Sequence, residues 1–147
     1  MNLGVYTQSM GISNEVEAIV TNLNKGIEEN KLSSASLFFN STGFNPLPLR
    51  CGCFNAADLW NFTGKLITTT LSNVVRANSI VNKAEVYYYY GWEEAVPVLH
   101  LINISRSKTT KVLCRNKEAR DNYYRLTGEE PHGVVNDFDL DQLVKLV

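Results

Sequence analysis

Two adjacent carboxylates and an indole stand together at Gly91-Trp92-Glu93-Glu94, directly after an apolar run. Neighbouring acids can divide into a proton donor and a proton acceptor when burial raises the pKa of one of them. Glu93 and Glu94 are therefore candidate catalytic residues, and Trp92 is a candidate ligand contact. The alternative is that both glutamates are solvated residues that open a helix, where the positive end of the helix dipole favours acidic side chains.

A polar loop, Tyr6 to Asn14, follows the first apolar run and precedes a helical pattern. A loop of this kind presents free backbone N–H groups at a helix N-terminus, where they favour an anion such as phosphate. Ser9 and Gly11 are therefore candidate ligand-binding residues. The loop lacks the G-x-G-x-x-G and G-x-x-x-x-G-K-[ST] patterns of nucleotide-binding loops, so an ordinary connecting loop is the alternative.

Two further ligand-binding candidates stand at the ends of other apolar runs. Thr69 lies at the end of the β-branched run Leu66-Ile67-Thr68-Thr69-Thr70. Arg115 follows the run Lys111-Val112-Leu113-Cys114, in the most basic region of the chain, and its guanidinium could hold a phosphate or an acidic group. The alternative for this basic region is a solvated face.

The cysteine pattern argues against a disulfide framework and against a metal centre. Cys51, Cys53 and Cys114 are an odd number of cysteines, which is typical of reduced thiols in an intracellular protein. Cys51-Gly-Cys53 does not have C-x-x-C spacing, and His100 and His132 are the two histidines of the chain. We predict no metal and no cofactor.

Composition predicts one globular domain over residues 1–147. The chain is 44% hydrophobic and 20% charged, and its 14 basic and 15 acidic residues leave a formal net charge of −1. This balance gives no strong nucleic-acid signal and no attraction to an anionic membrane. The amino terminus has no basic leader, and no apolar run approaches the roughly 18 residues of a membrane span. We therefore expect a cytoplasmic location.

Strand and helix patterns alternate along the chain. Strands are predicted at 3–6, 35–39, 66–70, 85–90, 111–114 and 133–135, and 98–104 is either a helix or a strand. Helices are predicted at 14–28, 55–62, 72–81, 116–127 and 139–147. The tyrosine run 87–90 suits a strand that is buried on both faces. The stretch 40–52 is rich in Ser, Gly, Asn and Pro, which predicts a long loop.

Capping residues mark the ends of three helices. Asn14 with Glu17 fits a capping box, and Asp139 precedes Gln142 in the same way. Asn116 is a predicted N-cap, and Gly128 stands where a C-cap glycine is expected.

The alternation predicts an α/β fold, a single Rossmann-like domain with a mostly parallel sheet flanked by helices. Ligands of such sheets bind outside the carboxyl ends of the strands. Ser9, Thr69, Glu93 and Arg115 all follow predicted strands, so we expect them to converge at that edge.

Three segments in the closing third of the chain form a recognisable series: Lys111 to Arg120, Leu126-Thr127-Gly128 and Val134 to Leu140. Together they resemble the end of the amino-terminal domain in GT-B type glycosyltransferases. In that family a strand leads to a Ser-x-x-x-(Arg/Lys) helix and then to an Asn-Gly-Val-Asp turn. Here Asn116 replaces the serine and Asn136-Asp137-Phe138-Asp139 replaces the turn.

Two other segments are similar to parts of the same family. The Ser9 and Gly11 loop resembles its acceptor-side loop, and Asp58-Leu59-Trp60 resembles a mid-domain segment. The family binds its nucleotide-sugar donor in a second domain, which this chain lacks. The short, Asn- and Tyr-rich sequence is also similar to small proteins of marine cyanobacterial tailed phages, which would make it a viral protein in the host cytoplasm.

The resemblance implies a non-catalytic or accessory binding module, related to half of a GT-B glycosyltransferase. Such a module would act through a protein partner or as a homo-oligomer. The alternative is a small transferase or hydrolase that acts on a nucleotide or nucleotide sugar, with Glu93 or Glu94 as the base and the loop at Ser9 holding an anion.

Overall fold

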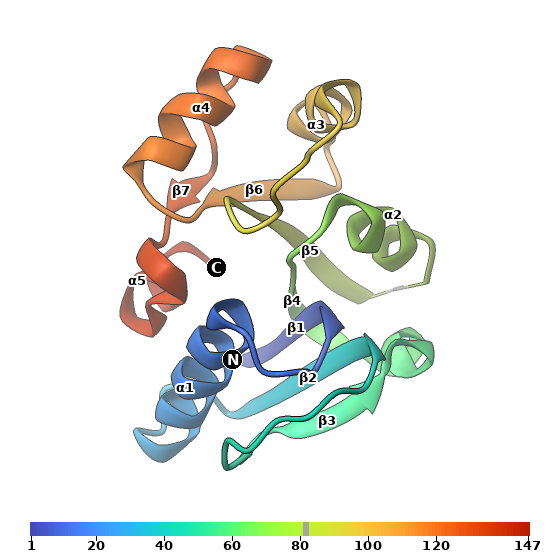
Figure 1. The fold of residues 1–147 in the computed structure, drawn as a ribbon, viewed down its shortest axis with the longest axis vertical. Coiled ribbons are helices and arrows are strands. Elements are labelled where there is room, and N and C mark those ends of the chain that lie inside the picture. The colour runs from blue at the N-terminus through green and yellow to red at the C-terminus, as the bar shows by residue number, and fades with distance from the viewer. Residues whose placement is uncertain (81–82) are drawn as a thin grey trace.

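A computed structural model describes residues 1–80 and 83–147 and places all the strands in one seven-stranded sheet (Figure 1). The strands are β1 (Asn2–Ser9), β2 (Ser34–Ser41), β3 (Gly52–Asn55), β4 (Thr63–Thr68), β5 (Lys83–Tyr90), β6 (Thr110–Cys114) and β7 (Gly133–Val134). The α-helices are α1 (Asn14–Glu28), α2 (Leu71–Ile80), α3 (Val98–Ser105), α4 (Lys117–Thr127) and α5 (Leu140–Leu146). Two 3₁₀-helices, η1 (Ala56–Asn61) and η2 (Asn136–Phe138), complete the described elements.

The sheet is built from two halves that wind away from its centre in opposite directions. Its strand order is β3-β2-β1-β4-β5-β6-β7, and all six described strand pairs are parallel. The order reverses between β1 and β4, which is the switch point of a doubly wound sheet. The predicted α/β, Rossmann-like, parallel architecture is confirmed.

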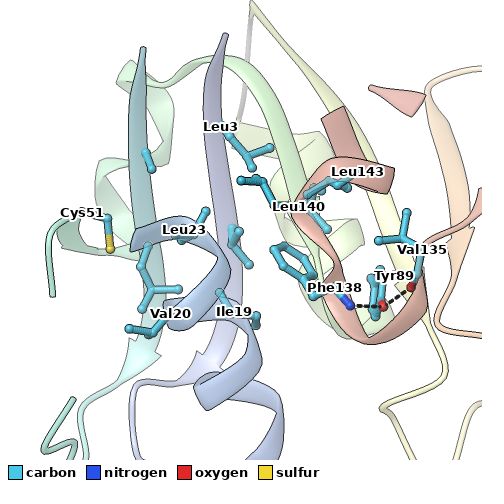
Figure 2. Packing of buried hydrophobic residues seen from close by; sticks show 14 of the residues in the cluster. Leu3, Ile19, Val20, Leu23, Cys51, Tyr89, Val135, Phe138, Leu140 and Leu143 are labelled. Carbon is cyan, nitrogen blue, oxygen red and sulfur yellow. Dashed lines mark hydrogen bonds between the residues drawn. The ribbon is translucent and has the colours of Figure 1, made fainter. Parts of the chain in front are cut away.

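Helices cover both faces of the sheet. One face carries α1 and α5, which lie side by side in Figure 1 and share a core with β1, β2, β4, β5 and β6. Figure 2 shows side chains of this core, with Ile19 and Leu23 of α1 on the same side of the sheet as Leu140 and Leu143 of α5. The opposite face carries η1 and α2 in one cluster and α2, α3 and α4 in another.

The tyrosine run of β5 lies at the centre of this arrangement. Tyr87 and Tyr89 point into the core under α1 and α5, whereas Tyr88 and Tyr90 point into the core under α2, α3 and α4. All four are at most 6% exposed. The predicted strand, buried on both faces, is confirmed, and it explains why the run does not alternate between polar and apolar residues.

Several predicted caps are confirmed by their hydrogen bonds. Asn116 Oδ1 accepts from the backbone N–H of Ala119 at 2.7 Å, and Asp139 Oδ1 accepts from that of Gln142 at 2.9 Å. Gly128 ends α4 in the left-handed conformation, with φ +74°. The prediction for α1 was wrong by one residue, because Ser13 is the N-cap and accepts from the N–H of Val16.

Three other segments differ from or refine the sequence prediction. The end of the predicted loop continues into a short edge strand, β3, which pairs with β2. Residues 42–51 contain no helix or strand, and Leu47 and Cys51 within them pack in the core that includes α1. The ambiguous run 98–104 forms α3. Val81, predicted to end the second helix, lies outside the described residues.

No helix within residues 1–80 and 83–147 is long and apolar enough to cross a membrane.

Candidate functional site

The predicted convergence at the carboxyl edge of the sheet can be followed in the strand bounds. Ser9 ends β1, Thr69 follows β4, and Arg115 follows β6. Glu93 lies three residues after β5. All four strands are parallel, so these residues lie along one edge of the sheet.

A cavity of about 910 Å³ opens at this edge, between the segment after β5 and one side of α4. We call it the β5–β6 cleft. Its lining combines four acids, two arginines, two asparagines, Tyr90, Trp92 and a few small or apolar side chains. The charged and amide residues are Glu93, Glu94, Glu118, Asp121, Arg115, Arg125, Asn116 and Asn122.

Sequence reasoning therefore identified part of this lining. Trp92, Glu93, Glu94 and Arg115 were all candidates, and the fold brings them to one cavity. Ser9, Gly11 and Thr69 are not among its lining residues.

The loop at Ser9 and Gly11 is covered by another part of the chain. The N–H of Met10 donates to Ser41 O at 3.1 Å, and that of Ile12 donates to Phe44 O at 2.8 Å. Gly43 approaches so closely that a Cβ added to it would lie 2.7 Å from Gly11 Cα. The Ser9 hydroxyl accepts from the N–H of Gly11 at 3.0 Å. An anion at this loop would have to displace residues 42–45.

Glu93 joins the β5–β6 cleft to the start of α2. Its Oε2 accepts a hydrogen bond from the N–H of Leu71 at 3.1 Å and one from the Tyr88 hydroxyl at 3.0 Å. Burial, with the charge of Glu93 beside it, raises the pKa of Tyr88, so this hydroxyl keeps its proton and donates. The carboxylate thus fixes the segment after β5 against the positive end of a helix.

Arg115 links the cleft to the turn after β7. Its Nε donates to Asp137 Oδ1 at 2.8 Å, and its guanidinium carbon lies 5.8 Å from the ring centroid of Trp92. The Trp92 ring in turn stacks on Phe138, with 6.0 Å between centroids and 21° between planes. The guanidinium of Arg115 and the indole of Trp92 therefore lie together, and a ligand in the cleft could contact both.

The turn that carries Asp137 has an unusual backbone. Asp137 and Phe138 both have positive φ, at +45° and +63°, which is strained for residues other than glycine. Tyr89 holds this turn from the sheet, because its hydroxyl donates to Val135 O at 2.5 Å and accepts from the N–H of Phe138 at 2.8 Å, as Figure 2 shows. Buried hydrogen bonds therefore offset part of the strain.

The opposite wall of the cleft is one side of α4. Asn122 Nδ2 donates to the Tyr90 hydroxyl at 2.7 Å, and Arg125 donates to Asn122 Oδ1. Asn122, Arg125 and Glu118 were not among the residues predicted from the sequence. Glu118, Asn122 and Arg125 are spaced four and three residues apart, and this spacing was the signal, since such residues share one side of a helix.

A further carboxyl, Glu15 in the first turn of α1, lies close to the same edge. Burial raises its pKa, a hydrogen bond from Thr69 lowers it, and the nearby charges of Glu93 and Arg115 raise and lower it respectively. The result is a net upward shift. Three of the residues predicted to converge thus act on one carboxyl, and this residue was missed because it begins a helix instead of following a strand.

Among the described residues, no group of three or more His, Cys, Asp and Glu side chains is placed to hold a metal ion. The lining of the cleft instead offers hydrogen-bond donors and acceptors beside an aromatic ring.

Comparisons of this chain with protein-family models, curated proteins and solved structures give no match.

Proposed function

We propose that the protein is a non-catalytic binding module, and that its β5–β6 cleft takes a polyhydroxylated ligand such as a sugar or the sugar part of a nucleotide sugar. The relation to half of a GT-B glycosyltransferase belongs to this proposal, as does the cytoplasmic location, which is the host cytoplasm if a phage encodes the chain. The free thiols of Cys51, Cys53 and Cys114 support the location.

One observation carries the ligand class: the mixture of acceptors and donors in a single cavity. Sugar hydroxyls both donate and accept hydrogen bonds. The carboxylates of Glu94, Glu118 and Asp121 are acceptors, whereas Arg125 and the Asn122 amide supply donors. Acids outnumber arginines four to two in the lining, which favours a neutral ligand over a phosphate.

The hydrogen bonds of Glu93 support a binding role over a catalytic one. Its Oε2 already accepts hydrogen bonds from the N–H of Leu71 and the hydroxyl of Tyr88. A general base needs an oxygen that reaches the proton of the substrate. Glu93 is better suited to hold the cleft in shape.

Calorimetric titration and thermal unfolding with glucose, galactose, mannose, N-acetylglucosamine, UDP-glucose and UDP test the proposal. A sugar at about 100 times its dissociation constant should stabilise the fold by about 2.7 kcal/mol.

Arg125→Ala should weaken binding at least tenfold. Lys117→Ala is the matched control, because Lys117 is an exposed cation of the same helix outside the cleft lining. If none of these compounds binds at millimolar concentration, the proposal fails. Binding of UDP as strong as that of UDP-glucose would contradict the ligand class.

An enzyme is the second candidate, a transferase or hydrolase acting on a nucleotide or nucleotide sugar. The observation that favours it is the raised pKa of Glu15 beside Glu93, since a carboxyl shifted in this way can donate a proton closer to neutral pH. Glu94 would then be the base. Turnover of UDP-glucose by the purified protein, lost in Glu94→Gln while binding persists, would support the enzyme. Binding without turnover would support the module.

A further inference from the structure

Helix α3 fully buries only one of its aliphatic side chains and exposes two of them to solvent. Five of its eight residues are aliphatic, yet Leu101 is the one that is buried. Leu99 is 75% exposed and Val98 is 43% exposed. Exposed aliphatic residues that cluster on one element commonly mark a surface that another protein covers.

A groove lies beside these side chains, between α3 and α2. It encloses about 520 Å³ and is lined mainly by apolar groups, with Leu71 and Val75 from the α2 side and Pro97 and Ile104 from the α3 side. Val75 is itself 65% exposed. The two helices are neighbours on the same face of the sheet (Figure 1). We call α3, the groove and the exposed side of α2 the α2–α3 surface.

Opposite charges flank the two ends of α3. Glu93 and Glu94 precede it, and Arg106 and Lys108 follow it. Glu94, Arg106 and Lys108 are exposed. Along α3 the surface is therefore acidic before the helix and basic after it. Between the charges lie the exposed aliphatic residues Val98 and Leu99 and the polar residues His100 and Asn103.

We propose that a second copy of this chain covers the α2–α3 surface, with the two α3 helices antiparallel about a two-fold axis. In that orientation the acidic end of each helix meets the basic end of the other. A two-fold interface uses the same patch on both subunits, so the patch must be complementary to itself. The charge pattern of α3 meets this condition, because its acidic end can face the basic end of a second copy. A parallel arrangement would place like charges together.

The position of the axis follows from the charges. Pairing of Glu94 with Arg106 of the partner centres the contact on position 100, midway between them. Leu99 is next to this point, so each copy can insert Leu99 into the groove of the other. An eight-residue helix is only about 12 Å long. The interface is small, so we expect a weak dimer whose population depends on protein concentration.

Sedimentation velocity of the purified chain from 1 to 200 µM tests the dimer. We expect a reversible monomer–dimer equilibrium, and Leu99→Asp should leave a monomer throughout this range. Phe44→Asp is the matched control, because Phe44 is 79% exposed on a segment remote from α3 in the sequence and should not change the equilibrium. Circular dichroism should show the same fold for all three proteins.

Charge reversal tests the antiparallel orientation. Glu94→Arg and Arg106→Glu should each weaken the dimer about tenfold, and the double variant should recover it, because the two charges are exchanged. A wild-type monomer at 200 µM would overturn the proposal, as would a dimer that survives Leu99→Asp. Failure of the double variant to recover association would overturn the two-fold pairing. The ligand of the β5–β6 cleft is omitted from these experiments, so their outcome does not depend on the proposed function.

Discussion

Glu15 carries a negative charge that its surroundings disfavour. It lies in the first turn of α1, where the helix dipole stabilises an anion, yet burial raises its pKa and the nearby Glu93 raises it further. Thr69 and Arg115 oppose the shift only in part. The charged form therefore costs stability in the folded state.

Glu15→Gln should stabilise the protein at pH 7. Between the ordinary pKa of 4.5 and the higher folded value, the native state binds more protons than the unfolded state, so stability falls as pH rises through this window. Glu15→Gln has no charge to bury, so it does not lose stability in this window. Urea unfolding from pH 4 to 8 should show a higher free energy of unfolding for Glu15→Gln than for the wild type near neutral pH. This difference should vanish below the ordinary pKa of the carboxyl.

Glu17→Gln is the control for this experiment, since Glu17 is an exposed acid in the same first turn. Glu17→Gln should not raise the free energy of unfolding at pH 7, because the helix dipole favours an exposed acid there. A wild-type protein whose stability rises steadily from pH 4 to 8, with no gain for Glu15→Gln, would contradict the shift.

At the scale of elements, Gly91 sets how closely β5 and α4 approach. Its φ is +130°, and a Cβ at this position would lie 2.7 Å from Arg115 Cβ and 3.3 Å from Ala119 Cβ. Gly128 also has positive φ, but a Cβ there would meet nothing within 4 Å. Gly91 therefore combines backbone strain with close packing, whereas Gly128 has backbone strain without a close neighbour.

Gly91→Ala should be more harmful than Gly128→Ala. The Gly128 variant should lose about 1 kcal/mol, the cost of a left-handed conformation. The Gly91 variant should lose more in urea unfolding and should also weaken ligand binding in the β5–β6 cleft, because Arg115 must move. Equal losses in the two variants, with binding unchanged, would show that β5 and α4 tolerate a side chain between them.

Elements whose ends are set by local chemistry could be predicted from the sequence. Asn116, Gly128 and Asp139 satisfy backbone groups within one or two turns, and their positions were correct. At α1 two adjacent residues, Ser13 and Asn14, can both cap a helix, and the choice depends on how the loop enters.

Features that depend on contacts between distant elements could not be predicted. β3 is four residues long, and pairing with β2 decides its conformation. For the candidate site, the sequence indicated which residues follow strands. It contained no signal for the hydrogen bonds of Glu93 to Leu71 and Tyr88, or for the cover of residues 42–45 over the first loop, because both arise from packing across elements.

At the scale of the whole molecule, α5 completes the core that α1 begins. Leu140 and Leu143 are fully buried beside Ile19 and Leu23, and Leu140 N donates to Asn22 Oδ1 at 3.1 Å. Lys25 and Lys31 both pair with Asp141 at the exposed rim. Most of the energy of this contact should come from the apolar side chains, since exposed ion pairs contribute little.

Leu143→Ala should cost about 2–5 kcal/mol, because it leaves a cavity in the core shared by α1, α5 and the sheet. Leu99→Ala makes the same chemical change on an exposed helix and should cost less than about 0.5 kcal/mol in dilute protein. Urea unfolding checks both. Similar losses of unfolding free energy in the two variants would mean that α5 packs only weakly against the core.

The contact between α1 and α5 also sets when the protein can fold during translation. Glu28 and Leu140, at the facing ends of these helices, are separated by 112 positions. At about 5–20 residues per second, the ribosome needs roughly 6 to 22 s to cover that interval. Throughout this time the part of α1 that packs on α5 lacks its partner, although β1 and β2 are already available to it. We therefore expect the core between α1 and α5 to form only after α5 has emerged from the ribosome.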